Sequence, residues 1–346
     1  MRRPKRKPRI RRRRTVIAAA VAGVVLVAAL GVFLLNQRGG ADVVVPAANS
    51  VVRIDADTNV FDEAVPVGED PTGVAIGEDG DVWVINEGDS TVNRIDPETR
   101  EVTPAKSTLG IPTGVAAGES AVWITNGFGS ASGTQVVTVD PTTESVEVAF
   151  PSGNEKAIVV AFESIWLADA DRDQVLRFDP QNLSAGPTAI AVDDDGVADE
   201  APRFLAVGTD TAEGIWVANE LGDTVVRIDP ATDEVDARIP VEGPTGVAAG
   251  DSGIWVTSET LDRVHRFDAA DGRALQTYQQ EDGILDGPTV IALGPSGVWI
   301  GSDLESAIAR IAPGATTVER LALDGIAGGL VVDGSGDVWV TIRAPF

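Results

Sequence analysis

Residues 71–97 read PTGVAIGEDGDVWVINEGDSTVNRIDP, which divides into three short apolar segments separated by Gly, Asp and Ser turns. A weaker fourth segment follows near residues 101–105. Short apolar segments with such turns between them predict an antiparallel meander of four strands, which we label a to d.

The meander recurs along the chain, and each copy is marked by one tryptophan in strand b. Successive tryptophans are 39 to 50 residues apart: Trp83, Trp123, Trp166, Trp216, Trp255, Trp299 and Trp339. A period near 40 to 45 residues is typical of propeller blades with four strands each. In five copies an arginine of strand c follows the tryptophan by 11 residues: Arg94, Arg177, Arg227, Arg266 and Arg310. This fixed spacing predicts a constant register between strands b and c.

The two ends of the chain carry complementary halves of one copy. The last copy stops after strands a and b, at residues 329–332 and 337–340, whereas residues 51–55 match strand c and residues 59–67 supply strand d. Pairing of the halves leaves no open sheet edge between the first and last blades. We therefore predict an all-β, seven-bladed β-propeller over residues 51–346, closed by two strands from each end.

The segment before the repeats predicts a membrane anchor. Residues 1–14 contain ten Lys or Arg and no acid, and residues 15–35 are a run of 21 uncharged residues. Such a run spans about 30 Å of hydrocarbon as a helix, and no small-residue cleavage pattern follows it. The positive-inside rule then predicts a cytoplasmic tail at 1–14, one transmembrane signal anchor at 15–35, a linker at 36–50 and an extracytoplasmic propeller. The basic tail could instead bind nucleic acid, but it lacks aromatic residues.

The net charge of the remaining chain limits the kinds of partner that it can bind. Residues 41–346 carry 16 Lys or Arg against 53 Asp or Glu, a balance of −37. This charge repels nucleic acid and anionic wall polymers and attracts cationic ligands. The alternative explanation is that the charge only keeps the protein soluble. The absence of cysteine excludes disulfides and thiolate chemistry. We expect a monomeric ring that binds an envelope protein, a wall component or a small ligand.

The repeated residues have structural explanations. A tryptophan bracketed by apolar neighbours predicts packing between blades, with sugar stacking as the functional alternative. The Asp-Pro pairs that follow strand c predict turns into strand d rather than acid/base chemistry.

Functional residues are expected where the copies differ. The turns that enter strand a and those that leave strand b surround one mouth of a propeller's central channel. Side chains there are either ordinary turn residues or ligand contacts, and Glu155 and Arg203 stand out because they replace a common threonine. The ligand-binding candidates are Thr72, Glu87, Thr113, Glu155, Lys156, Arg203, Glu220, Thr245, Glu259, Thr289 and Asp303.

An acidic insertion at residues 193–200 raises the question of a metal. Its carboxylates suit Ca²⁺, but the spacing is not that of a calcium loop. We predict no catalytic residues and no cofactor, with Ca²⁺ or Mg²⁺ as the alternative.

The repeated P-x-G-V-A, G-x-V-W-V-T and V-x-R-I-D-P motifs resemble those of streptogramin B lyase (virginiamycin B lyase) propellers, and more broadly the YVTN and NHL propellers. The resemblance covers residues 51–346 and implies a seven-bladed ring. It also implies a lyase that opens a ring with metal, histidine and glutamate near the channel mouth. The single histidine, His265, lies in strand c away from that mouth. We therefore predict a binding or scaffold module, with a metal-dependent lyase or hydrolase that uses rim carboxylates such as Glu220 or Glu259 as the alternative.

Overall fold

The computed structural model describes residues 47–62, 64–127, 134–153, 157–193 and 200–345. The predicted tail and transmembrane segment, and nearly all of the linker, lie outside these residues. Within the described ranges, no helix is long and apolar enough to cross a membrane.

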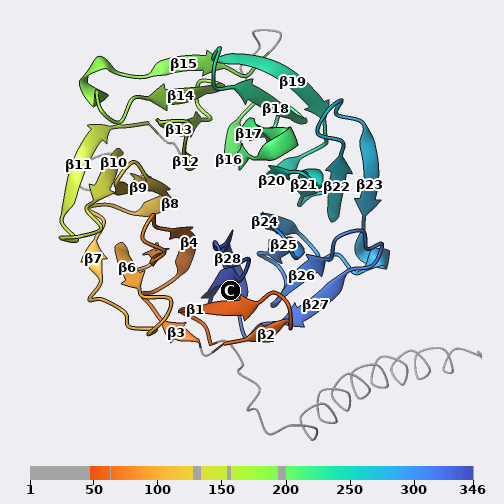
Figure 1. The fold of residues 1–346 in the computed structure, drawn as a ribbon, viewed down its shortest axis with the longest axis horizontal. Helices are drawn as coiled ribbons and strands as arrows, with labels where there is room; N and C mark the ends of the chain where they lie inside the picture. Colours follow the sequence, from red (N-terminus) through yellow and green to blue (C-terminus); the bar gives the residue numbers. More distant parts are fainter. Residues whose placement is uncertain (1–46, 63, 128–133, 154–156, 194–199, 346) are drawn as a thin grey trace, which may run out of the picture. The chain divides into compact units, whose positions relative to one another are not determined.

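Seven antiparallel sheets form a ring, as the repeats predict (Figure 1). We number the blades in chain order. Blade 1 holds β4 (Pro71–Ile76), β5 (Val82–Asn86), β6 (Thr91–Ile95) and β7 (Lys106–Ser107), and blade 2 holds β8 (Pro112–Gly118), β9 (Ala121–Asn126), β10 (Gln135–Val139) and β11 (Val146–Pro151). Blade 3 holds β12 (Ile158–Ala161), β13 (Ser164–Asp169), β14 (Gln174–Phe178) and β15 (Thr188–Ala191), and blade 4 holds β16 (Pro202–Gly208), β17 (Gly214–Asn219), β18 (Thr224–Asp229) and β19 (Glu234–Pro240).

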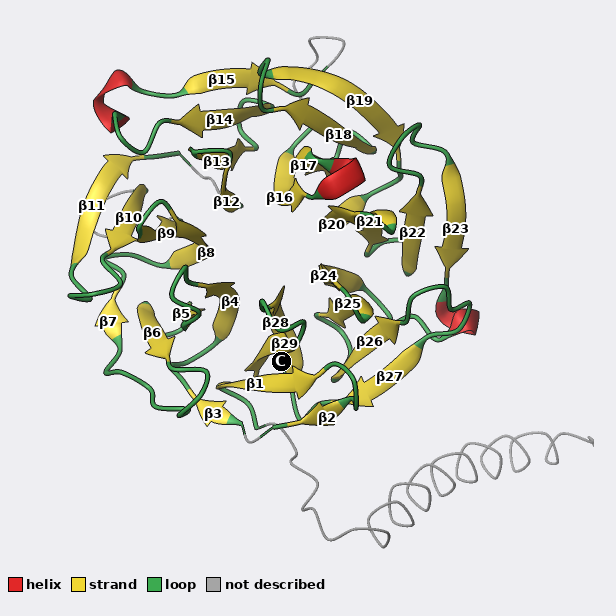
Figure 2. Ribbon diagram, viewed as in Figure 1, coloured by secondary structure: helices red, strands yellow, loops and turns green. Residues whose placement is uncertain are grey.

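The remaining blades continue the pattern around the ring. Blade 5 holds β20 (Pro244–Gly250), β21 (Gly253–Ser258), β22 (Arg263–Phe267) and β23 (Ala274–Tyr278), and blade 6 holds β24 (Pro288–Gly294), β25 (Gly297–Ser302), β26 (Ala307–Ile311) and β27 (Glu319–Ala322). Blade 7 holds β28 (Ile326–Val332), β29 (Val338–Arg343), β1 (Ser50–Asp55), β2 (Val60–Phe61) and β3 (Val65–Pro66). The part of the chain that the structure describes also contains three short 3₁₀ helices in turns: η1 (Leu183–Ala185), η2 (Asp210–Ala212) and η3 (Gln280–Asp282) (Figure 2).

Blade 7 confirms the predicted closure. Strand β1 pairs antiparallel with β29, and Arg53 stands opposite Trp339, as strand c stands opposite strand b in the other blades. The Nε of Arg53 donates to Oδ2 of Asp337 at 2.8 Å. Backbone pairing and a side-chain contact therefore both join the N-terminal strand to the last one.

Strand d differs from its prediction in two blades. In blade 7 it is split into β2 and β3, each of which pairs separately with β1. In blade 1 the pairing lies at Lys106–Ser107, with one isolated bridge between Ile95 and Val102, rather than at residues 101–105. Outermost strands pack on one side only, so their apolar pattern is weak and their bounds are poorly specified by sequence.

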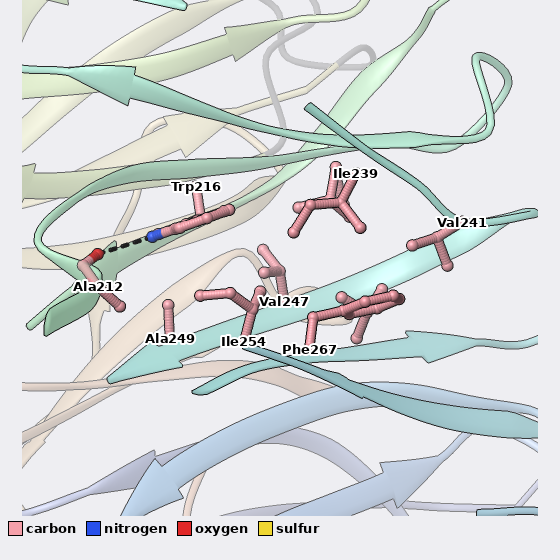
Figure 3. Packing of buried hydrophobic residues seen from close by; sticks show 11 residues of the cluster. Ala212, Trp216, Ile239, Val241, Val247, Ala249, Ile254 and Phe267 are labelled. Carbon is pink, nitrogen blue, oxygen red and sulfur yellow. Dashed lines mark hydrogen bonds between the residues drawn. The ribbon is translucent and has the colours of Figure 1, made fainter. Parts of the chain in front are cut away.

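The tryptophans fill the seams between blades. None is more than 4% exposed, so packing explains them and sugar stacking does not. In the seam between blades 4 and 5, Trp216 packs with Val247, Ile254 and Phe267, and its indole N–H donates to the carbonyl of Ala212 at 2.8 Å (Figure 3). A ring of this size contributes several kcal/mol at about 25 cal/mol per Å² of buried apolar area.

The Asp-Pro pairs are turns, as predicted. In the turn after β6, Oδ1 of Asp96 accepts hydrogen bonds from the backbone N–H groups of Glu98 and Thr99 at 2.8 Å. These backbone hydrogen bonds hold the pKa of Asp96 below its ordinary value. The aspartates therefore stabilise turns as carboxylates.

Candidate ligand site at the channel mouth

Within the described residues, strand a begins with a β-bulge in six blades. One residue has no direct partner on strand b at each of these points: Thr72, Thr113, Arg203, Thr245, Thr289 and Gly328. A bulge bends the strand and re-aims the extra side chain. The bulges explain why the threonine of the repeated P-T-G motif lies at the ring's centre.

The strand-a starts enclose a cavity of about 440 Å³ at the centre of the ring. All seven blades contribute to its wall, including Thr72, Thr113, Ala157, Arg203 and Thr289. Valine, leucine and isoleucine side chains of the same strands form the deeper wall. The volume falls within the range of about 300–1,000 Å³ that is usual for ligand pockets, with polar groups at the entrance and an apolar interior.

The threonines of the mouth are not equivalent. Thr245 is 4% exposed, and its hydroxyl donates to the carbonyl of Pro288 at 3.0 Å. It stabilises the seam between blades 5 and 6, and the prediction that it contacts ligand does not fit this burial. Thr113 contacts Thr125 at 3.1 Å between their hydroxyl oxygens.

Thr72 differs from both because its hydroxyl oxygen has no hydrogen-bond partner among the described residues. Strand b of blade 1 carries Ile85 where blade 2 carries Thr125, so the hydroxyl that would pair with Thr72 is missing. The Thr72 hydroxyl oxygen is buried, so it is an unsatisfied polar group behind the mouth and is not presented to a ligand.

Both arginines of the mouth are paired. Arg203 donates to Glu220 of the same blade in a short ion pair. Arg343, at the end of β29, donates from Nε to Oδ1 of Asp70 at 2.6 Å. Although burial opposes its charged form, this bonding to Asp70 raises the pKa of the Arg343 guanidinium. Asp70 was missed from the sequence because it precedes strand a, at a position where blades 2, 4, 5 and 6 carry Ile, Ala or Gly.

Carboxylates dominate the rest of the rim. Burial, together with the nearby charges of Asp303 and Glu220, raises the pKa of Glu259 above its ordinary value. Asp303 and Glu87 also lie close enough to Arg343 to stabilise its charge. A line of interacting charges therefore runs along the rim through blades 4, 5, 6, 7 and 1. Its carboxylates are Asp70, Glu87, Glu220, Glu259 and Asp303, and its arginines are Arg203 and Arg343.

Three carboxylates of this line are unpaired. Within the described residues Glu87, Glu259 and Asp303 form no ion pair, although Asp303 accepts a hydrogen bond from the Thr289 hydroxyl at 3.3 Å. Glu155 and Lys156, the remaining candidates, lie outside the described residues, as does most of the acidic insertion at 193–200. In the described ranges, no group of three or more acidic or histidine side chains is placed to hold a metal ion.

The single histidine lies away from the mouth. His265 is in the middle of β22, opposite Val256 and Thr277, and its Nδ1 is 3.1 Å from the Thr277 hydroxyl oxygen. Strand a, which lines the channel, is two strands further inward. The mouth therefore offers hydroxyls, carboxylates and paired guanidiniums, but no imidazole base.

The fold and the mouth together define a seven-bladed β-propeller with a central, negatively charged cavity entrance. Among solved structures, the chain is similar to a streptogramin B lyase, with 15% identity, a TM-score of 0.65, and coverage of 79% of this chain and 91% of that one. A catalytically inactive histidine-to-alanine variant of virginiamycin B lyase from Staphylococcus aureus, solved with quinupristin, is similar with 13% identity, a TM-score of 0.61, and coverage of 78% and 94%.

A third similar structure is a protein of unknown function from Desulfotomaculum acetoxidans, with 14% identity, a TM-score of 0.63, and coverage of 86% of this chain and 100% of that one. No family model and no curated protein matches the sequence. At these identities the comparisons confirm the lyase-like propeller fold that the motifs suggest.

Proposed function

We propose that the chain is a membrane-anchored, extracytoplasmic binding module that holds a cationic ligand at its channel mouth. The observation that carries the proposal is the excess of carboxylates along the mouth, above all Glu259, which forms no ion pair in the described part of the chain. Glu220 and Asp70 already form ion pairs, with Arg203 and Arg343 respectively. Glu259 and its neighbours Asp303 and Glu87 are left to receive an ammonium or guanidinium group.

The surroundings of Glu259 favour such a ligand. The rim of the mouth carries five carboxylates against two arginines, and such an excess of one sign of charge raises the local concentration of counter-ions. Burial raises the pKa of Glu259 most, and repulsion from Asp303 and Glu220 raises it further; a bound cation relieves that repulsion.

Binding is tested by calorimetry on the detergent-solubilised full-length chain. The probes are tetralysine and its side-chain-acetylated form, which keeps the backbone and removes the charges. We expect only tetralysine to bind, more weakly as salt screens the mouth. Glu259→Gln should weaken binding about tenfold or more, because hydrogen bonds to charged groups contribute about 1.5–3 kcal/mol. Glu147→Gln, an exposed carboxylate on β11, is the matched control. Equal binding of the acetylated probe, or unchanged affinity in Glu259→Gln, contradicts the proposal.

The anchored topology is supported by the basic tail and the uncharged run at residues 15–35. The chain contains no cysteine, so a single introduced thiol can be labelled without background. In intact cells a membrane-impermeant maleimide should label Ser184→Cys, an exposed position in blade 3, and should not label Pro4→Cys. Labelling of both positions, or of Pro4→Cys alone, refutes the topology.

A further inference from the structure

A second cavity lies at the other end of the channel-lining strands. It has a volume of about 730 Å³ and is bounded by the ends of β16, β20 and β24 with the turns that follow them. It continues outward between blades 5 and 6, where Arg266 and residues 312–314 line it. Leu205, Val247 and Ile291 line both this cavity and the channel mouth. The inner wall is therefore apolar, and one cation lies at the outer end.

Arg266 is unlike every other arginine at its position. The strand-c arginines of the other blades each have a carboxylate oxygen within 4 Å: Arg53 with Asp337, Arg94 with Asp81, Arg177 with Asp233, Arg227 with Asp236 and Arg310 with Glu319. Arg266 forms no ion pair in the described residues. A guanidinium that borders a cavity without an anionic partner is an unusual feature in a chain with so many carboxylates.

The turn of the next blade differs as well. Arg94 and Arg177 reach across the seam and donate to the carbonyls of Pro141 and Pro230 in the following blade. In blade 6 the equivalent turn is Ala312-Pro313-Gly314, with alanine where the other blades carry aspartate, and Arg266 makes no such bond to it. The small side chains leave the cavity open beside the guanidinium.

Arg266 is nevertheless held in place. Its Nε donates to the carbonyl of Ser252 at 2.7 Å, and its guanidinium carbon lies 5.2 Å from the centroid of the Trp255 ring. Tyr278 stacks on the same ring and donates its hydroxyl to the carbonyl of Ala315 at 2.8 Å. The side chain is thus oriented, while its two terminal nitrogens have no hydrogen-bond partner among the described residues. They can donate as a pair to one carboxylate.

We propose that this cavity is a second ligand site, which binds an amphipathic monocarboxylate. The carboxylate accepts hydrogen bonds from Arg266, and the apolar body lies against Leu293, Val207 and the shared channel wall. Asp210 and Asp251 also line the cavity and disfavour a second negative charge on the ligand. This site does not depend on the function proposed for the channel mouth, since the two cavities share only the apolar residues Leu205, Val247 and Ile291.

The test uses three probes with alkyl groups of equal length: octanoate, octanol and octylammonium. The full-length protein is kept in a detergent whose micelles do not take up the probes at the concentrations used. Binding is followed by saturation-transfer NMR and calorimetry. We expect octanoate to bind at least about tenfold more tightly than octanol, the factor that one charge-assisted pair supplies. Arg266→Gln should remove this preference for the acid. Arg227→Gln, at the same register in blade 4 and paired with Asp236, should leave it unchanged.

A further variant tests the apolar wall. Leu293→Asn should weaken octanoate and octanol to the same degree, because it alters the wall and not the head-group contact. Glu259→Gln at the opposite mouth should leave octanoate binding unchanged, so failure of one site is distinguishable from failure of the other. Equal affinity for the acid and the alcohol, or an acid preference that survives in Arg266→Gln, overturns the proposal.

Discussion

The strength of ring closure can be measured at Ile54. This side chain of β1 is fully buried and packs in the core cluster that joins blades 6 and 7. Replacing a buried isoleucine by alanine costs about 2–5 kcal/mol, since apolar burial is lost and a cavity remains. If β1 is as firmly held as an internal strand, Ile54→Ala should cost the same as Ile228→Ala, the equivalent fully buried position in blade 4.

Urea unfolding measures both costs as a shift of the midpoint at an unchanged slope. Val60→Ala in β2 serves as the baseline, because this side chain is 57% exposed and surface changes stay within about 0.5 kcal/mol. The reasoning fails if Ile54→Ala costs less than about 1 kcal/mol while Ile228→Ala costs the expected amount. Such a result would mean that the N-terminal strand frays from the ring before the ring unfolds.

Three other predictions concern stability and are checked by thermal or urea unfolding. Glu259 has a raised pKa in the folded chain, so it favours folding less as pH rises above its ordinary value of 4.5. Glu259→Gln should therefore stabilise the protein at pH 7 relative to pH 4, and an unchanged pH profile would contradict this. His265 has a pKa lowered by burial from 6.5, so its neutral form is favoured in the folded state, and the stability it contributes is present above pH 6.5 and lost as pH falls below it. His265→Gln should lack this loss, as seen by comparing midpoints at pH 7.5 and 5. Gly297 has φ of +124°, and a Cβ there would lie 2.2 Å from the carbonyl oxygen of Ile311, so Gly297→Ala should cost more than about 1 kcal/mol. Gly80→Ala, with a positive φ but open space, should cost less, and the reverse order would refute the steric argument.

The ring was predictable because its signals are repeated. The tryptophan and the strand-c arginine recur at fixed spacing, and the register that they predict is found in each blade where both occur, as in the pairing of Trp83 with Arg94. The closing pair of Arg53 and Trp339 followed from the same rule. Strand d has no such marker residue, so the sequence specifies its position poorly. In blade 1 the observed strand d is displaced from the predicted one, and in blade 7 it is divided into two strands.

The candidate site was only partly predictable. Thr72 and Arg203 line the central cavity, because the start of strand a is fixed by the repeat, whereas their contact with a ligand stays a prediction. The burial of Thr245 depends on the Pro288 carbonyl of the next blade, a contact across a seam that a single repeat does not encode. The ion pair between Arg343 and Asp70 joins blade 7 to blade 1. It could not be predicted, because it is also a contact between blades.

Closure by β1 also fixes the order in which the molecule can be completed during synthesis. The side chains of Arg53 and Asp337 meet across 284 sequence positions, so the edge of β1 that pairs with β29 stays open until the last strand has been made. Until then two unsatisfied edges stay open to pairing with other chains. A truncated product that ends before β29 keeps the edges of β1 and β28 unpaired. Only the finished polypeptide covers both edges and so avoids aggregation or proteolysis that begins there.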